Sequence, residues 1–299
     1  MALSIRHRLA SSSMGMFDRP DSSVRVVKKV VFISAEGKHT EKDYFEHLQS
    51  VLESQDDKLP VVIHVLRHEK DCCSDPSHVF ELLEECSLIR KDDFLFEETK
   101  RNLPVLFTDE KVYAYFKNPE KLPDDERKEF RSELIKAGIS VDYYQWLRQI
   151  GNKTEADVFA VVLDRDTHSH KDVLLEEIYN KCQERGFRFC LTNPCFEFWL
   201  LLHLCDVGSK ATERQKHFLQ RNKKLSNNHT YVSYIVSSAA HHGKSISRGK
   251  FENVYFPNMK VACERAKSFA TTFKDVVSSV GTTLPDFIEE IMGLVVAPQ

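Results

Sequence analysis

The sequence lacks the features that mark membrane-spanning, secreted and zinc-ribbon proteins. No apolar run approaches the roughly 20 residues that a transmembrane helix needs, and residues 1–17 lack the apolar core of a secretion signal. Eight cysteines are present, but none form a CxxC pair, the spacing typical of zinc ribbons and thioredoxin-type redox sites. We therefore expect a soluble, cytoplasmic protein that does not engage membranes, with reduced and mostly buried thiols.

Positive charge is also not in excess. Lys and Arg number 42 and Asp and Glu 45, which gives a formal net charge of -3. This balance excludes a uniformly basic coat, so any contact with nucleic-acid phosphates must come from a local patch. The chain shows no internal repeat or low-complexity tract, and 299 residues with 41% apolar content can bury a substantial core.

Strands that alternate with helices predict an α/β fold, with a mostly parallel central sheet flanked by helices. Residues 1–24 are polar and predict a flexible tail, residues 25–206 the α/β domain, and residues 207–299 a basic segment followed by helices that pack back on the core. Charge and proline within 91–152 predict a helical insertion in that domain. The expected strands are 26–34, 61–66, 157–164 and 187–191. The expected helices are 40–52, 76–89, 124–137, 141–150, 169–185, 194–204, 257–272 and 284–294, with Thr40 and Asn193 as caps of two of them.

Two carboxylates stand at the end of the strand 157–164, whose unbroken apolar interior predicts a central position in the sheet. Asp164 and Asp166 are two residues apart, so alternation directs both side chains to one side and Arg165 to the other. Ligands bind at this edge of open α/β sheets, and neighbouring carboxylates are stable there when a hard cation offsets their repulsion. The pattern predicts a site for Mg²⁺ or Mn²⁺.

Glu36 ends another strand that reads as central, and Gly37 beside it allows a tight turn. We expect Glu36 to complete the metal site, as a ligand or as the base that takes a proton from water. An Asp-x-Asp pair alone often only caps a helix or forms a turn. A glutamate at the end of a separate strand favours the metal site, because capping needs only one carboxylate per helix.

Glu197 lies one position beyond the capping-box glutamate if Asn193 is the cap, so helix initiation does not explain it. It is either a further metal ligand or a solvated or ion-paired side chain. His168 and His170 follow the Asp-x-Asp pair and are either proton donors, extra ligands or ordinary loop histidines. Phe196 and Trp199 are expected in the core because their helical neighbours are apolar.

A local basic patch is expected after residue 206, where Glu213 is the one acid before Phe251. Its Gly/Ser-containing stretch 241–250 can follow a phosphate backbone, or it can be a mobile, solvated loop. The side chains expected to contact nucleic acid are Lys38, Lys223, Lys224, Lys244, Arg248 and Lys250.

Three motifs, AEGKHTEKDYF at 35–45, VVLDRD at 161–166 and NPCFEFWLLLH at 193–203, resemble the signatures of the RloB family, which is Toprim-like. The resemblance implies a magnesium-dependent nuclease centre at Glu36, Asp164 and Asp166. It also implies a toxic effector of bacterial phage defence by abortive infection, acting on RNA, such as transfer RNA, in preference to DNA. An ATPase partner and a homo-oligomer are further expectations.

Two other functions fit parts of the pattern. A phosphatase of the haloacid dehalogenase type would use Asp164 as its nucleophile, but its Asp-x-Asp pair follows the opening strand and leaves Glu36 without a role. A non-catalytic regulator would sense a metal ion or nucleotide at the acidic site and bind nucleic acid or a protein through the basic segment. The intact set of carboxylates favours the nuclease.

Overall fold

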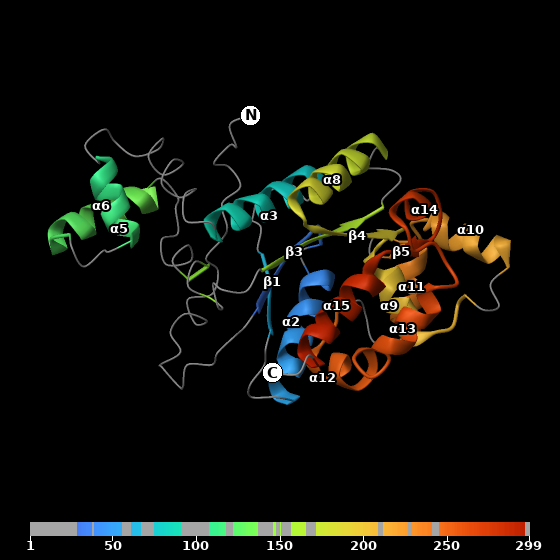
Figure 1. Cartoon of the computed structure of the whole chain (residues 1–299). Helices are drawn as coiled ribbons and strands as arrows, with labels where there is room; N and C mark the ends of the chain where they lie inside the picture. Colours follow the sequence, from blue (N-terminus) through green and yellow to red (C-terminus); the bar gives the residue numbers. More distant parts are fainter. Residues whose placement is uncertain are drawn as a thin grey trace.

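A computed structural model shows a central sheet with helices on both faces, which confirms the predicted α/β class (Figure 1). The strands are β1 (Lys29–Ala35), β2 (Val61–Val65), β3 (Val158–Asp164), β4 (Arg188–Asn193) and β5 (Gly281–Thr282). The structure describes residues 29–37, 39–55, 61–66, 75–90, 108–117, 122–136, 146–147, 150, 157–165, 172–208, 212–226, 229–240 and 245–296.

The strand order is β2-β1-β3-β4-β5, with the first four strands parallel and β5 antiparallel to β4. In the register between β1 and β3, Ala35 lies opposite Val162, and between β3 and β4 Asp164 lies opposite Thr192. Because parallel neighbours end at the same edge of the sheet, the segments that follow β1 and β3 meet there.

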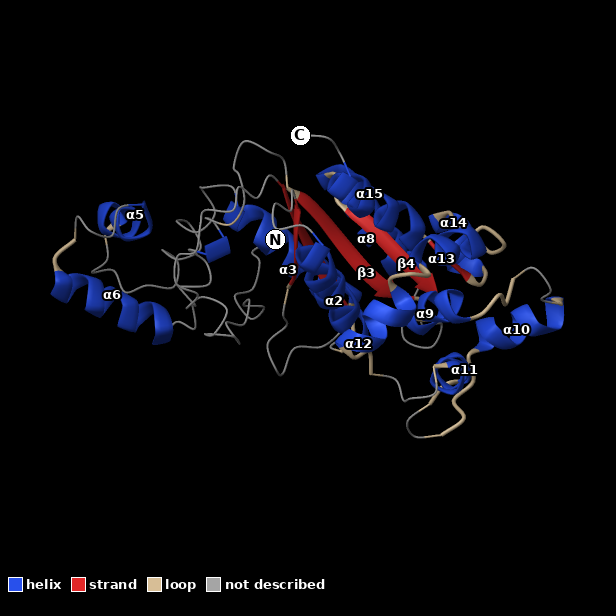
Figure 2. Ribbon diagram, turned by 90° about the horizontal axis from the view of Figure 1, so that it is seen from below, coloured by secondary structure: helices blue, strands red, loops and turns tan. Residues whose placement is uncertain are grey.

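Alternation of side chains along the strands divides the core into two layers. On β1, Val31 and Ile33 face one layer, whereas Val30 and Phe32 face the other. The first layer is closed by α2 (Thr40–Gln55), α9 (Phe196–Leu204), α13 (Met259–Ala266) and α15 (Leu284–Val296). The second is closed by α3 (Pro76–Arg90), α8 (Asp172–Arg185) and α14 (Phe273–Ser278). Figure 2 shows α2, α9 and α15 in front of the sheet.

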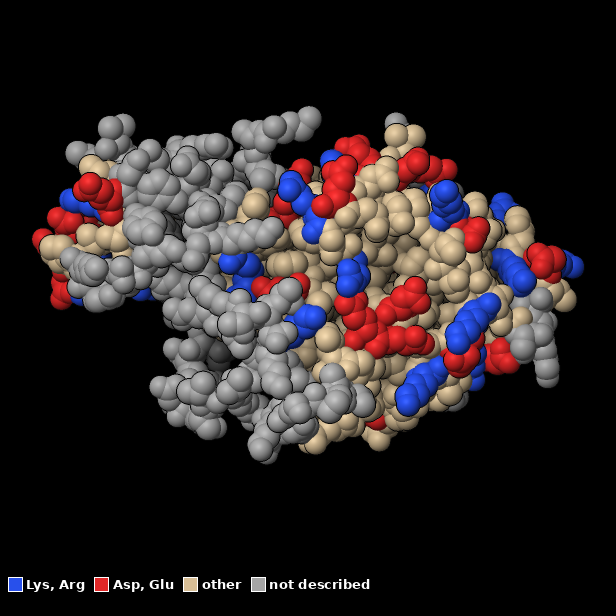
Figure 3. All heavy atoms as spheres, viewed as in Figure 1, with Lys and Arg blue, Asp and Glu red and all other residues tan. Residues whose placement is uncertain are grey.

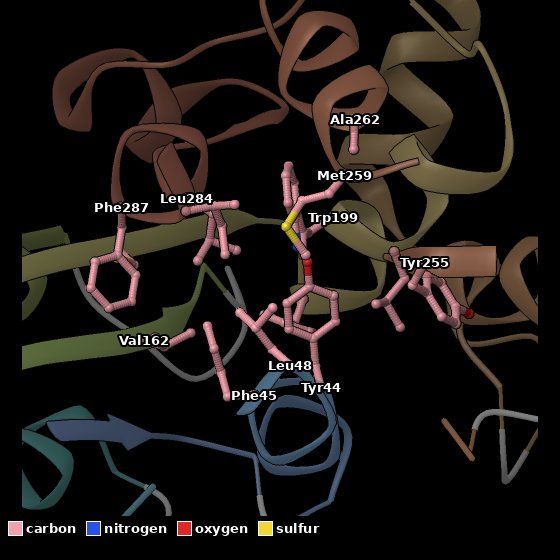
Figure 4. Close-up of a cluster of buried hydrophobic side chains, with 14 of the residues drawn as sticks. Tyr44, Phe45, Leu48, Val162, Trp199, Tyr255, Met259, Ala262, Leu284 and Phe287 are labelled. Carbon is pink, nitrogen blue, oxygen red and sulfur yellow. The ribbon is translucent and has the colours of Figure 1, made fainter. Parts of the chain in front are cut away.

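The layer that contains α2 and α9 is rich in aromatic side chains (Figure 4). Phe196 and Trp199 are buried there, as predicted. Tyr44 of α2 lies beside Trp199, and its hydroxyl is 3.2 Å from Nε2 of His203. Burial lowers the pKa of His203 to about 4, and Nδ1 donates to the carbonyl of Trp199 at 3.0 Å, so Nε2 accepts from the tyrosine. This bond fixes α2 against α9.

The predicted start of α9 is wrong. The helix begins at Phe196 with Cys195 as its N-cap, and the bond between Asn193 and Pro194 is cis. Asn193 instead ends β4, where it pairs with β5, and its Nδ2 donates to the carbonyl of Val276 at 2.7 Å. Because Cys195 is still extended, the chain turns into the helix two residues later than predicted. Similarly, Thr40 is the first residue of α2 and not its cap.

The described part of the basic segment is mostly helical, which the sequence pattern did not predict. It contains α10 (Glu213–Arg221), α11 (Tyr231–Ala239) and α12 (Arg248–Lys250), followed by a π-helical turn, η2 (Phe251–Tyr255). The two predicted C-terminal helices correspond to α13 and α15, and both contribute buried side chains to the core, as expected. Within the described ranges, no helix combines the length and the apolar composition needed to cross a bilayer.

The predicted insertion contains α5 (Asp109–Lys117) and α6 (Asp124–Lys136), which lie to the left in Figure 1. The rings of Tyr115 and Phe130 are 4.4 Å apart, and Nζ of Lys111 is 3.1 Å from the carboxylate of Glu126, so the two helices pack on each other. The helix predicted at 141–150 falls mostly outside the described residues, as does the N-terminal tail. The domain boundaries stay a prediction.

Candidate acidic metal centre

Glu36 and Asp164, two of the three acidic residues predicted to act together, meet at the carboxyl edge of the sheet. The backbone N–H of Glu36 donates to the carbonyl of Val162 at 3.0 Å, which extends the pairing of β1 and β3 by one residue. Oε2 of Glu36 then accepts the backbone N–H of Asp164 at 3.1 Å. The Glu36 side chain therefore lies across the end of the neighbouring strand, 128 residues away in the sequence.

Asp164 also joins β3 to the start of α9. Its Oδ1 accepts the backbone N–H of Phe196 at 2.8 Å, so it satisfies a helix N-terminus that the side chain of Cys195 does not cap. The side chain of Arg165 lies on the other side of β3. Its Nε donates to the carbonyl of Val277 at 3.1 Å, and its guanidinium pairs with Asp172. These contacts follow the alternation expected at the end of a strand.

Glu41, in the first turn of α2, is an acidic residue that the sequence interpretation missed. It is only 5% exposed, although it carries a carboxyl group. The carboxyl lies directly over Gly37, where an added Cβ would come within 1.8 Å of Oε2 of Glu41. The sequence contained one indication that Glu41 is buried. It stands three, four and seven residues before Tyr44, Phe45 and Leu48, on the face of α2 that packs into the core.

Glu197 acts electrostatically on two of these carboxyl groups. Burial, together with the charges of Glu197 and Glu36, raises the pKa of Glu41 to about 8. Burial also raises the pKa of Asp164 well above its usual value, and the charges of Glu41, Glu36 and Glu197 add to this effect. We call Glu36, Glu41, Asp164 and Glu197 the acidic cluster. It cannot carry four negative charges without a proton or a cation to offset them.

Glu197 occupies the second position of α9, because the helix begins at Phe196. A carboxylate in the first turn interacts favourably with the helix dipole. Glu197 can therefore stabilise the start of α9. The predicted cap at Asn193 had excluded this role, because it placed Glu197 beyond the capping-box position. Its effect on the pKa of both Glu41 and Asp164 also assigns it to the acidic cluster.

Cys195 borders the acidic cluster and was not singled out by the sequence. Its Sγ is 3.4 Å from Nδ2 of Asn222. Burial and the charges of Glu197 and Asp164 raise the pKa of the thiol well above its usual value. The thiol is therefore protonated at neutral pH and is not a reactive nucleophile.

The donor atoms of the acidic cluster are hard carboxylate oxygens, the ligands that Mg²⁺ and Mn²⁺ prefer. Counting only side chains that the structure describes, no three Asp, Glu, His or Cys residues are positioned to hold one metal ion together. Asp166, His168 and His170 lie outside the described residues. The chemistry of the cluster fits a divalent ion, and a complete ligand set would have to include Asp166 or a rearrangement of the cluster.

Four of the six basic residues expected to contact nucleic acid are described, and they lie in two places. Lys223 and Lys224 are exposed at the end of α10 and directly follow Asn222, which touches Cys195. Arg248 and Lys250 lie on α12, where Arg248 pairs with Glu252 at 2.7 Å and burial lowers the pKa of Lys250. Lys38 and Lys244 are outside the described residues. Figure 3 shows Lys and Arg side chains in separate groups on the visible face, with acidic side chains between them.

The contact between Gly37 and Glu41 leads to a testable expectation. Gly37→Ala should lower the free energy of unfolding by about 1–3 kcal/mol, because the new methyl group overpacks a buried carboxyl. Denaturant unfolding would measure the change. Gly249→Ala is the matched control, since an added Cβ there meets nothing within 4 Å. If the penalty persists in a Glu41→Ala background, the contact with Glu41 is not its cause.

A family model described as RloB-like protein matches residues 31–291, which is most of the chain. The matched range includes the ends of β1 and β3, the start of α9 and the C-terminal helices. No curated protein and no solved structure matches the sequence.

Proposed function

The chain belongs to the RloB-like protein family, and we propose that it is a Toprim-like nuclease that hydrolyses phosphodiester bonds with Mg²⁺ or Mn²⁺ at the acidic cluster. One observation carries this proposal: Oε2 of Glu36 lies 3.1 Å from the backbone nitrogen of Asp164, with Glu41 and Glu197 close enough to raise the pKa of Asp164. Carboxylates gathered from three segments at the ligand-binding edge of an α/β sheet are typical of a cation site.

We assign the roles of the residues from the chemistry of their side chains and from the resemblance to the family. Asp164 and Asp166 would bind the cation, with Glu36 and Glu197 as further ligands. A bound divalent ion polarises the phosphodiester and lowers the pKa of the attacking water. Glu36 would also take the proton of that water, because its carboxylate lies beside Asp164 at the ligand-binding edge of the sheet. Glu41 would hold a proton in the cation-free protein and release it when the positive charge arrives.

The biological setting is proposed on the resemblance to the family. We propose that the protein acts in the cytoplasm as a toxic effector of antiphage defence, on RNA, such as transfer RNA, in preference to DNA. An ATPase of the same defence system and a second copy of this chain are its proposed partners. Sequencing the 5′ and 3′ ends of cellular RNA and DNA after induced expression would test the substrate. Unchanged RNA ends beside newly cleaved DNA would refute the preference.

The activity itself can be tested with the purified full chain. End-labelled RNA and DNA should be cleaved when Mg²⁺ or Mn²⁺ is added and should stay intact in EDTA. Cleavage that continues at the same rate in EDTA, or in Glu36→Gln, would contradict the proposal. Release of phosphate from a phosphomonoester, with a phosphoaspartate trapped on Asp164, would instead support the phosphatase. Binding of nucleic acid without any cleavage would support the non-catalytic regulator.

A further inference from the structure

Helices α10 and α11 together carry a row of aromatic rings at the surface. Phe218 of α10 is 43% exposed, and its ring centroid is 6.2 Å from that of the half-buried Tyr231. Tyr234, 54% exposed, stands one helical turn after Tyr231 on the same face of α11. Leu225, in the connection between the helices, is 51% exposed. Exposed large apolar side chains that occur together mark an interaction site more often than scattered single ones do.

The charged side chains of the segment that carries these rings are almost all positive. In the described residues of 212–240, Glu213 is the one acidic side chain, and it pairs with Lys216 at 3.3 Å. The guanidinium of Arg214 lies 5.7 Å from the centre of the Phe218 ring, so a cation and an aromatic face are presented together. The exposed cations are Arg214, Arg221, Lys223 and Lys224. We call these four cations with Phe218, Leu225, Tyr231 and Tyr234 the α10–α11 surface.

This surface is held in place relative to the acidic cluster. Both helices begin with a capping box, at Thr212 and Thr230, and α11 buries Val232 and Val236 in the core layer that includes α9. Asn222, between the two helices, accepts the backbone N–H of Val232 at 3.0 Å and donates to Sγ of Cys195. A chain of direct contacts therefore runs from Lys223 through Asn222 and Cys195 to the start of α9.

We propose that the α10–α11 surface binds single-stranded nucleic acid, with bases stacked on Phe218 and Tyr234 and the backbone phosphates on Lys223 and Lys224. Every base has a face that can stack on an aromatic ring, but in a duplex those faces are covered by neighbouring bases. Exposed rings among cations thus favour an unpaired strand over a duplex, which is contacted mainly through its phosphates. Binding at this surface does not depend on the proposed nuclease function. Only the further step, in which the bound strand is the substrate that the acidic cluster cuts, rests on that function.

Fluorescence anisotropy of a labelled oligouridylate, titrated with the full chain in EDTA, measures binding without cleavage. Phe218→Ala and Tyr234→Ala should each weaken binding about tenfold, whereas Tyr234→Phe keeps the ring and should bind like the parent. Lys223→Gln and Lys224→Gln should each lower the slope of log affinity against log salt by about 0.7. Val173→Ala, which shortens an exposed apolar side chain on α8, is the matched control and should have no effect.

The binding experiment tests the α10–α11 surface independently of the proposed nuclease activity. Binding is measured in EDTA and cleavage separately in Mg²⁺, so binding by the parent chain supports the inference whether or not the chain cleaves. Parental affinity in both Phe218→Ala and Tyr234→Ala, with their folding verified by circular dichroism, would overturn the inference, as would equal affinity for a duplex of the same length. If no oligonucleotide binds, the inference is wrong.

Discussion

Asp164→Asn is expected to lower metal-dependent cleavage by about 100-fold or more, because metal-ion catalysis contributes several kcal/mol to transition-state stabilisation. The same change should not unfold the protein. Asparagine keeps an oxygen that can accept the N–H of Phe196, and it removes a buried carboxyl whose ionisation is opposed by burial and by the charges of Glu41, Glu36 and Glu197. In EDTA at neutral pH, the free energy of unfolding should rise. Cleavage rates with Mg²⁺ and denaturant unfolding without it would measure both effects.

Measuring both the cleavage rate and the stability distinguishes a catalytic role of Asp164 from a purely structural one. If Asp164 served only to cap α9, its substitution would lower the stability of the protein and leave its activity unchanged. Asp286→Asn is a suitable control, because Asp286 is an exposed acid in the first turn of α15, and its loss should leave the cleavage rate unchanged. Parental cleavage by folded Asp164→Asn would remove the basis of the nuclease assignment.

Glu41→Gln is expected to change how stability depends on pH. The pKa of Glu41 is raised from 4.5 to about 8 by folding, so its carboxyl stabilises the native state fully below pH 4.5. That contribution is lost as pH rises from 4.5 to 8. Glutamine does not ionise, so in EDTA the variant should exceed the parent in free energy of unfolding by about 4 to 5 kcal/mol at pH 8.5, and by much less at pH 5.

Denaturant unfolding at several pH values would measure this difference. His203 acts in the opposite direction, because burial lowers its pKa from 6.5 to about 4 and its contribution is lost as pH falls through that range. Both proteins share His203, so their difference isolates Glu41. Saturating Mg²⁺ should restore the stability of the parent at high pH. A difference that does not grow between pH 5 and pH 8.5 would show that Glu41 titrates normally in the folded chain.

The sequence was sufficient to predict the meeting of Glu36 and Asp164. Both residues follow apolar runs that are typical of central strands. Because parallel strands end at a common edge of the sheet, the two side chains had to meet once β1 and β3 were neighbours. The register between these strands then brings Oε2 of Glu36 to the backbone of Asp164. Asp166 lies outside the described residues, so its place in the site stays a prediction.

Other parts of the site depend on tertiary contacts that leave no local pattern. Glu41 was missed because an acid in the first turn of a helix is ordinarily solvated, and only the fold buries this one. The start of α9 was misplaced because Pro194 suits a first helical turn, whereas here Asn193 is held in the sheet by Val276 and by β5. At two residues, β5 is too short to produce a recognisable alternation.

The pairing of β4 with β5 makes the centre depend on the far end of the polypeptide. Thr192 and Thr282 share a hydroxyl hydrogen bond of 2.8 Å, and the backbone of Thr283 donates to Leu191 at 3.0 Å. A ribosome must therefore pass residue 283 before the strand that leads into α9 gains its outer neighbour. We expect a prematurely terminated chain to leave the edge of β4 unpaired, so that its acidic residues lack their final support.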